Sequence, residues 1–119
     1  MTFYLDTSTG KTIGIAALKA RVDTLNSMDL QEKFTHWMTH TSSFVFDCTE
    51  LDFVDSSGLG AIVSCLRRAL EKNGDLKLAG LNQKVSMVFD ITKARKLFSI
   101  FPDMQEALKS FTEPLPAQS

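Results

Sequence analysis

Apolar residues in the first part of the chain form two short runs and then a helical repeat. Residues 2–6 and 11–18 have the composition of strands and flank a turn at residues 8–10, which predicts an opening β-hairpin. Further along, apolar residues recur at the spacing of an amphipathic helix, at Leu30, Phe34, Trp37 and Met38. We therefore expect antiparallel strands followed by a first helix.

Strands and helices alternate through the middle of the chain. Residues 43–47 and 76–79 are short apolar runs typical of buried strands. A second helix is expected between them and is predicted to stop at Gly74. Its apolar stripe consists of Leu59, Ile62, Val63, Leu66 and Leu70. Asn82 is the expected N-cap of a third helix, whose apolar positions are Val85, Val88 and Phe89.

The last part of the chain predicts one more strand and one more helix. Residues 97–101 are expected to form the strand, and residues 102–103 lead into the helix. The apolar stripe of this closing helix is Met104, Ala107, Leu108 and Phe111. Residues 113–119 contain two prolines, and we expect them to form a flexible tail.

This order of elements predicts an α/β fold. Strands separated by helices pair in parallel through right-handed crossovers, whereas the initial hairpin adds antiparallel strands to the same sheet. We expect a mixed four- to five-stranded β-sheet with about four helices packed against it, forming a single domain over residues 1–112.

Composition narrows the classes of partner. The 119 residues are 44% hydrophobic and include nine Phe, which is enough for one core of ordinary size. The net charge of -1 gives no broad attraction for nucleic acid or anionic membranes. No apolar run approaches the roughly 18 residues of a membrane span. We therefore expect protein partners and a cytoplasmic location, with Cys48 and Cys65 as reduced, packed thiols.

The most informative stretch is the predicted strand-to-helix turn, with the sequence Asp55-Ser56-Ser57-Gly58. A serine at a helix N-terminus lies among unpaired amide groups and the positive end of the helix dipole, so a phosphate placed there is partly neutralised. The alternative is purely structural, because Asp and Ser are common N-caps and Gly permits a tight turn. However, one cap needs only one side-chain oxygen, and this turn offers three capping side chains.

Residues 53–60, Phe-Val-Asp-Ser-Ser-Gly-Leu-Gly, lie between an apolar strand and an apolar helix. This string resembles the signature of the STAS domain, the sulphate transporter and anti-sigma factor antagonist family. Asp23 resembles the aspartate that follows the second strand in the antagonists, and residues 74–89 resemble the next strand and helix. Two positions depart from the family pattern: Gln83 replaces a frequent proline, and Thr-Lys-Ala at residues 92–94 replaces a Ser-Gly-Leu-like turn.

The resemblance implies a small cytoplasmic anti-sigma factor antagonist. Proteins of this kind bind a partner-switching serine kinase, usually an anti-sigma factor, and so free the kinase's other client. The family's phosphate acceptor is the first serine after the aspartate, which maps onto Ser56, and a phosphoserine phosphatase is the expected second partner. The expected partner-binding residues are Asp23, Asp55, Ser56, Ser57, Gly58 and Leu59.

Several of these residues have alternative roles. Ser57 either caps the helix, hydrogen-bonds within the loop or accepts the phosphate in place of Ser56. Asp23 either caps the first helix, together with Thr24, or contacts a basic or hydroxyl group of the kinase. Gly58 is assigned to backbone geometry, as is Gly60, where close packing of the helix on the sheet is the simplest explanation.

Other functional classes find less support in the sequence. Ser56 is not in a G-x-S-x-G elbow, and His36 and His40 lie on or just after the first helix without a third metal ligand. No lysine follows Gly58 or Gly60, as a Walker A loop requires. We therefore expect no enzymatic activity, metal or cofactor. The remaining alternative is a phosphorylation-independent STAS scaffold, or a regulatory subunit of a signalling complex that does not act on a sigma factor.

Overall fold

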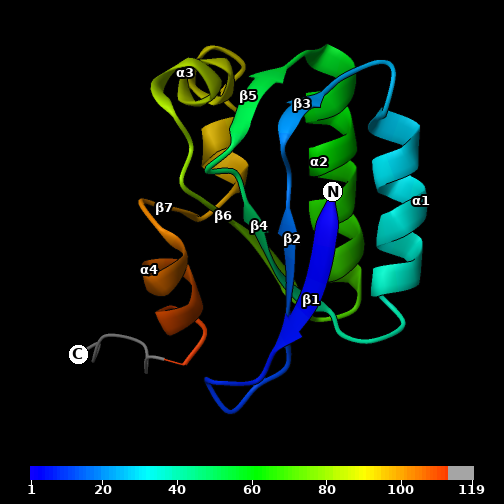
Figure 1. The fold of residues 1–119 in the computed structure, drawn as a ribbon, viewed down its shortest axis with the longest axis vertical. Coiled ribbons are helices and arrows are strands. Elements are labelled where there is room, and N and C mark those ends of the chain that lie inside the picture. The colour runs from blue at the N-terminus through cyan, green and yellow to red at the C-terminus, as the bar shows by residue number, and fades with distance from the viewer. Residues whose placement is uncertain (113–119) are drawn as a thin grey trace.

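A five-stranded mixed sheet forms the centre of the molecule (Figure 1). The computed structural model describes residues 1–112, and the tail expected at residues 113–119 lies outside this range. In spatial order the strands are β1 (Thr2–Asp6), β2 (Ile13–Ala17), β4 (Ser43–Asp47), β6 (Asp75–Ala79) and β7 (Ile100–Phe101). β1 is antiparallel to β2, and every later pair is parallel. The expected mixed sheet and its opening hairpin are thus confirmed.

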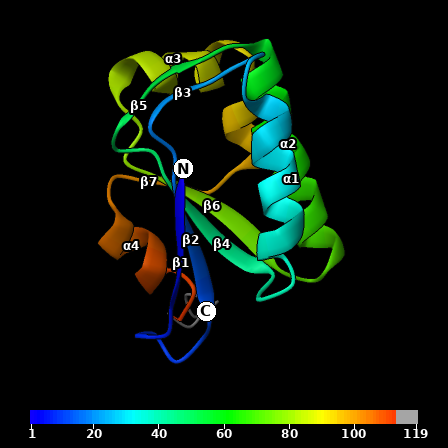
Figure 2. The same ribbon diagram turned by 45° about the vertical axis from the view of Figure 1, so that its right-hand side comes forward.

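Helices cover both faces of this sheet. The described chain contains α1 (Ser27–Trp37), α2 (Ser56–Glu71), α3 (Gln83–Ile91) and α4 (Met104–Lys109), as many α-helices as expected. α1 and α2 lie side by side on one face, and α4 packs against β4, β6 and β7 on the other (Figure 2). α1, α2 and α3 are the connections between successive parallel strands, which cannot be joined by a tight turn.

The core follows from the alternation of side chains along β4. Phe44 and Phe46 are fully buried beneath α1 and α2, where the ring centroid of Phe34 lies 4.6 Å from that of Phe44. Val45, between them, points to the opposite face and belongs to a smaller cluster with Ala107 of α4. The unbroken apolar run of this strand therefore reflects burial on both sides.

The structure contains a second sheet, of two strands, that the sequence pattern does not predict. β3 (Ala20–Val22) pairs in parallel with β5 (Leu51–Val54), so that Val22 lies opposite Val54. These strands are too short to establish an alternating pattern, and the register shifts where Ala20 adopts a left-handed backbone conformation (φ 63). This small sheet positions the two loops described in the next section.

The end of α2 and the length of the last strand also differ from expectation. Asn73, rather than Gly74, adopts the left-handed conformation (φ 61) that follows the end of α2. The last strand is shorter than the expected range 97–101, because the short 3₁₀ helix η1 (Ala94–Leu97) precedes β7. η1 begins after Lys93, which has a φ of 64. Glycine is the residue that normally adopts this left-handed conformation.

The departure from the family pattern at Gln83 does not disturb α3. The helix begins at this residue without a proline. Asn82 is its N-cap, as expected, because the Asn82 side chain accepts a hydrogen bond from the Val85 amide at 2.8 Å. A side-chain cap therefore defines this helix start without the fixed backbone angle of a proline.

Candidate functional site

The turn between β5 and α2 presents two serines in the first turn of a long helix. Asp55 is the N-cap of α2, and its Oδ1 accepts a hydrogen bond from the Gly58 amide at 2.8 Å. Ser56 and Ser57 are exposed, whereas Gly58 and Leu59 are buried. Asp55 thus fills the capping role considered for Ser57, and both serines are exposed residues.

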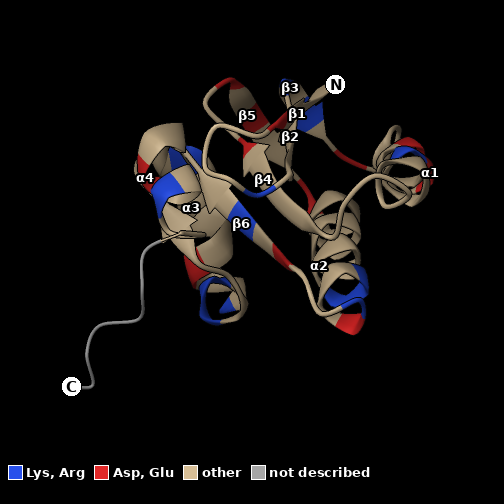
Figure 3. Cartoon of the chain, turned by 90° about the horizontal axis from the view of Figure 1, so that it is seen from below, with Lys and Arg blue, Asp and Glu red and all other residues tan. Residues whose placement is uncertain are grey.

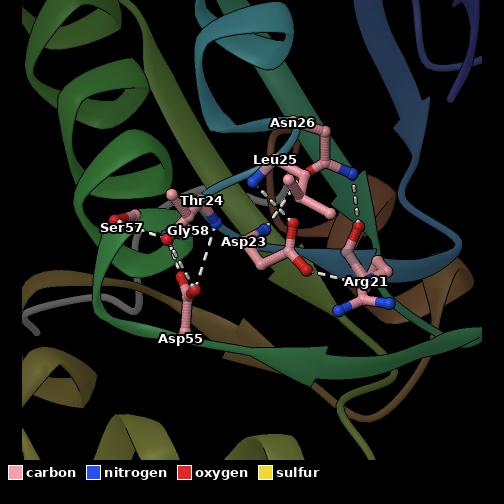
Figure 4. Close-up of polar contacts among 8 residues, drawn as sticks. All are labelled: Arg21, Asp23, Thr24, Leu25, Asn26, Asp55, Ser57 and Gly58. Atoms are coloured by element: carbon pink, nitrogen blue, oxygen red, sulfur yellow. Dashed lines mark hydrogen bonds and ion pairs between the residues drawn. The ribbon is translucent and has the colours of Figure 1, made fainter.

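A second loop, between β3 and α1, lies directly against this turn (Figure 4). The amide and the hydroxyl of Thr24 both donate to Asp55 Oδ2, each at 3.1 Å. The Thr24 hydroxyl also lies 3.2 Å from Ser57 Oγ. The loops meet because β3 and β5 are parallel, which brings their carboxyl ends to the same edge of the small sheet.

These contacts hold Asp55 in its ionised form. The hydrogen bond from the Gly58 amide is the largest cause of a lowered pKa for this carboxyl, and the amide and hydroxyl of Thr24 and the Ser57 amide lower it further. A carboxylate that accepts several N–H and O–H bonds is favoured over the neutral acid. The turn therefore carries a fixed negative charge beside the two serines.

Asp23 organises the β3–α1 loop from the inside. This residue is only 3% exposed, and its carboxylate pairs with Arg21 and accepts a hydrogen bond from the Leu25 amide at 3.0 Å. The N-cap of α1 is Asn26, which makes no side-chain capping bond. The capping role considered for Asp23 and Thr24 is therefore wrong, and the contact of Asp23 with a partner stays a prediction.

The two serines differ in their surroundings. Ser57 Oγ is engaged by Thr24, whereas the Ser56 side chain makes no hydrogen bond within the described residues. Adjacent serines look equivalent in the sequence. The contact that distinguishes them comes from Thr24, which is 33 residues away from Ser57 in the chain.

The two glycines of the turn have different reasons for being glycine. A Cβ atom at Gly58 would lie 1.9 Å from the carbonyl oxygen of Val22, so the close approach of α2 to β3 requires its absence. A Cβ atom at Gly60 would meet nothing within 4 Å. Close packing therefore explains Gly58 but not Gly60, and the assignment of Gly60 to helix packing is wrong.

Exposed apolar side chains flank the paired loops. Leu25 is 86% exposed and Met28 is 73% exposed, immediately after Thr24 and in the first turn of α1. Phe53 of β5 is 47% exposed. Leu25 and Met28 were not singled out from the sequence, because only the pairing of β3 with β5 brings their segment to the segment that carries the serines.

Other groups with reactive potential are structural or scattered. Cys48 and Cys65 are buried, and burial raises the pKa of each thiol to about 12. Within residues 1–112, no three His, Cys, Asp or Glu side chains are arranged to hold a metal. Over the same residues, no helix has the length and apolar character needed to cross a bilayer. Lys and Arg are interspersed with Asp and Glu on α1 and at the end of α2 (Figure 3).

Comparison with known protein families identifies the family to which the chain belongs. The model of the STAS domain family matches residues 4–107, which is most of the chain. The chain belongs to the STAS domain family. Its α/β fold is the one expected for a STAS domain, and the Asp-Ser-Ser-Gly turn lies within the matched region.

One curated relative of this STAS domain and two solved structures with a similar fold carry the description anti-sigma factor antagonist. The anti-sigma-B factor antagonist of Bacillus subtilis is 24% identical over 70% of this chain and 76% of its own. An antagonist structure from Thermotoga maritima has a TM-score of 0.80 and 18% identity, covering 91% of this chain and 92% of that chain. The unphosphorylated form of the antagonist SpoIIAA has a TM-score of 0.74 and 19% identity, covering 92% and 96%.

The phosphorylated form of SpoIIAA, described as a Bacillus cell fate determinant, is also similar in fold. Its TM-score is 0.68 and its identity is 18%, with coverage of 92% of this chain and 99% of that chain. Both forms of that protein therefore share the fold of this STAS domain.

Proposed function

We propose that this STAS domain is an anti-sigma factor antagonist controlled by phosphorylation of Ser56. In its unmodified form it binds a serine kinase that is also an anti-sigma factor, and phosphorylation releases it. The observation that carries the proposal is the state of Ser56. It is exposed and its side chain makes no hydrogen bond within residues 1–112, beside an ionised N-cap whose two carboxylate oxygens both accept hydrogen bonds. The antagonist relatives, one of them solved in a phosphorylated form, support this reading.

The reaction is a phosphoryl transfer in which the kinase supplies ATP. Ser56 Oγ forms a bond to the γ-phosphorus, the bond from that phosphorus to ADP breaks, and the hydroxyl proton passes to a base on the kinase. The domain contributes only the acceptor and its position, so it is a partner and not an enzyme. The start of α2 tolerates the product, because the helix dipole favours negative charge at this end.

Release follows from the charge around the turn. Phosphorylation adds about -1.5 to -2 charges next to Asp55, which is already ionised. Arg21 is the only Lys or Arg within residues 21–26 and 53–60, and it pairs with Asp23. Within these two segments the new charge therefore has no unpaired Lys or Arg to pair with, and it acts on the partner. A coupling of ~1–3 kcal/mol suffices to change affinity roughly 5- to 150-fold.

The proposed contact surface combines the expected residues with those found from the fold. Ser56 enters the kinase active site, and the exposed side chains of Leu25 and Met28 bury apolar surface beside it. Asp55 and Ser57 belong to the rim of this contact. Gly58 and Leu59 are buried, so they contribute to the contact only by shaping the turn that carries the serines.

Reversal of the switch requires a second partner. A phosphoserine at this position projects from an exposed turn, within reach of a phosphoserine phosphatase. We place the cycle in the cytoplasm, where ATP and an anti-sigma factor are both present.

The test is mass spectrometry of the protein after incubation with ATP and each purified candidate anti-sigma factor kinase from the same organism. We expect one phosphate on wild type, located on Ser56, and none on that residue in Ser56→Ala. Isothermal titration of the kinase with unmodified and phosphorylated protein should then show at least ~5-fold weaker binding of the latter. If a candidate kinase binds the protein tightly but places no phosphate on it, the result would favour a phosphorylation-independent scaffold instead.

A further inference from the structure

We propose that Thr24 determines which of the two adjacent serines is phosphorylated, by engaging Ser57 and leaving Ser56 available. This inference rests on the proposed function, because it concerns the selectivity of the same phosphoryl transfer. It gives Thr24 a positioning role: the residue acts through Ser57 and Asp55 and is not itself the acceptor.

The two serines offer the kinase the same chemistry but not the same freedom. Both are exposed at the start of α2, and both carry a primary hydroxyl. Thr24 Oγ1 lies 3.2 Å from Ser57 Oγ, within hydrogen-bonding distance, and the Ser56 hydroxyl has no such neighbour among the described residues. Figure 4 shows the Ser57 and Thr24 side chains turned toward each other above Asp55.

The contact hinders transfer to Ser57 because Ser57 is the donor in it. Thr24 has a single hydroxyl proton, which it donates to the ionised Asp55 Oδ2, so the contact between Thr24 Oγ1 and Ser57 Oγ takes the Ser57 proton. That proton is directed to Thr24 and not to the base of the kinase. The hydrogen bond must therefore break before the Ser57 Oγ–phosphorus bond forms and the bond to ADP is cleaved.

Thr24 cannot easily move aside to release Ser57. Its amide and hydroxyl both bind Asp55 Oδ2 at 3.1 Å, so the carboxylate holds it from two atoms. The preceding residue, Asp23, is buried and paired with Arg21, which fixes the loop on its other side. The position of Thr24 over Ser57 is therefore determined by backbone as well as side-chain contacts.

The test isolates Ser57 by removing the preferred acceptor. The rate of phosphorylation is measured with the candidate anti-sigma factor kinases and ATP for Ser56→Ala and for Ser56→Ala combined with Thr24→Val or Thr24→Ser. Valine keeps the shape of threonine without the hydroxyl, whereas serine keeps the hydroxyl. Peptide mass spectrometry locates the phosphate, and wild type reports whether Ser56 is an acceptor at all.

We expect Thr24→Val to raise the rate at Ser57 about 5-fold in the Ser56→Ala background, the factor that one neutral hydrogen bond contributes. Thr24→Ser should leave that rate close to the parent value. With Ser56 present, Thr24→Val should also raise the share of phosphate found on Ser57. Equal Ser57 rates with Val and Thr at position 24 would overturn the inference while leaving Ser56 phosphorylation intact. Absence of phosphate from wild type would instead overturn the proposed function and this inference with it.

Discussion

Gly58→Ala tests whether the close contact between α2 and β3 holds the candidate site together. A Cβ atom at this position would lie 1.9 Å from the Val22 carbonyl oxygen, whereas real Cβ contacts essentially never fall below 3.0 Å. The helix and the strand must therefore move apart by about 1 Å. That movement strains the hydrogen bonds at 3.1 Å by which Thr24 binds Asp55.

The expected loss of stability has two sources. Forcing a methyl group into a packed backbone contact costs ~1–3 kcal/mol. The movement also weakens the hydrogen bonds from Thr24 to Asp55. We therefore expect Gly58→Ala to lower the free energy of unfolding by ~1–3 kcal/mol, a sizeable part of the ~5–15 kcal/mol of a typical domain.

Gly60→Ala is the matched control, because it makes the same chemical change two residues further along the same helix. A Cβ atom there would meet nothing within 4 Å. Alanine favours a helix over glycine by ~0.5–1 kcal/mol, so this variant should be more stable than wild type.

Urea denaturation followed by circular dichroism measures both variants under the same conditions. The expected result is a lower midpoint for Gly58→Ala and a slightly higher midpoint for Gly60→Ala, with similar slopes. Midpoint shifts of the same sign and size in the two variants would refute the contact between α2 and β3 as the reason for glycine at position 58.

Two further predictions concern Asp55 and Lys93. The folded-state pKa of Asp55 lies below its unfolded value, so its ionised form stabilises the fold above the unfolded pKa of ~3.9 and this contribution is lost as pH falls through the folded pKa. The urea midpoints of wild type and Asp55→Asn should therefore differ at neutral pH and converge in acid, and a constant difference would contradict this. Lys93→Gly should raise the free energy of unfolding by ~1 kcal/mol, because Lys93 has a φ of 64, whereas Lys93→Ala, as control, should gain nothing.

The central sheet and its helices follow from local patterns in the sequence. Apolar spacing identified α1 and α2, and the contrast between residues 43–47 and their surroundings identified β4. The Asp-Ser-Ser-Gly turn was found in the same way, since a cap and the residues it caps are adjacent in the chain. These features depend on contacts within a few residues, which a single sequence records directly.

The rest of the site depends on contacts between distant residues. The bond from Thr24 to Asp55 spans 31 residues, and it exists only because two very short strands pair beneath it. Nothing in the composition of Ala20–Val22 distinguishes it from a loop. The different roles of Gly58 and Gly60 were hidden for the same reason, because the atom that excludes a side chain at one of them belongs to Val22.

The pairing of β3 with β5 also decides when during folding the site comes into existence. The Asp-Ser-Ser-Gly turn and the loop that carries Thr24 belong to segments separated by α1 and β4, so they meet only after the chain has wrapped around the core and closed the small sheet. A nascent or partly unfolded chain displays the serines without Thr24 above them. Under the proposed function, a kinase that binds both loops together would therefore recognise only the completely folded domain.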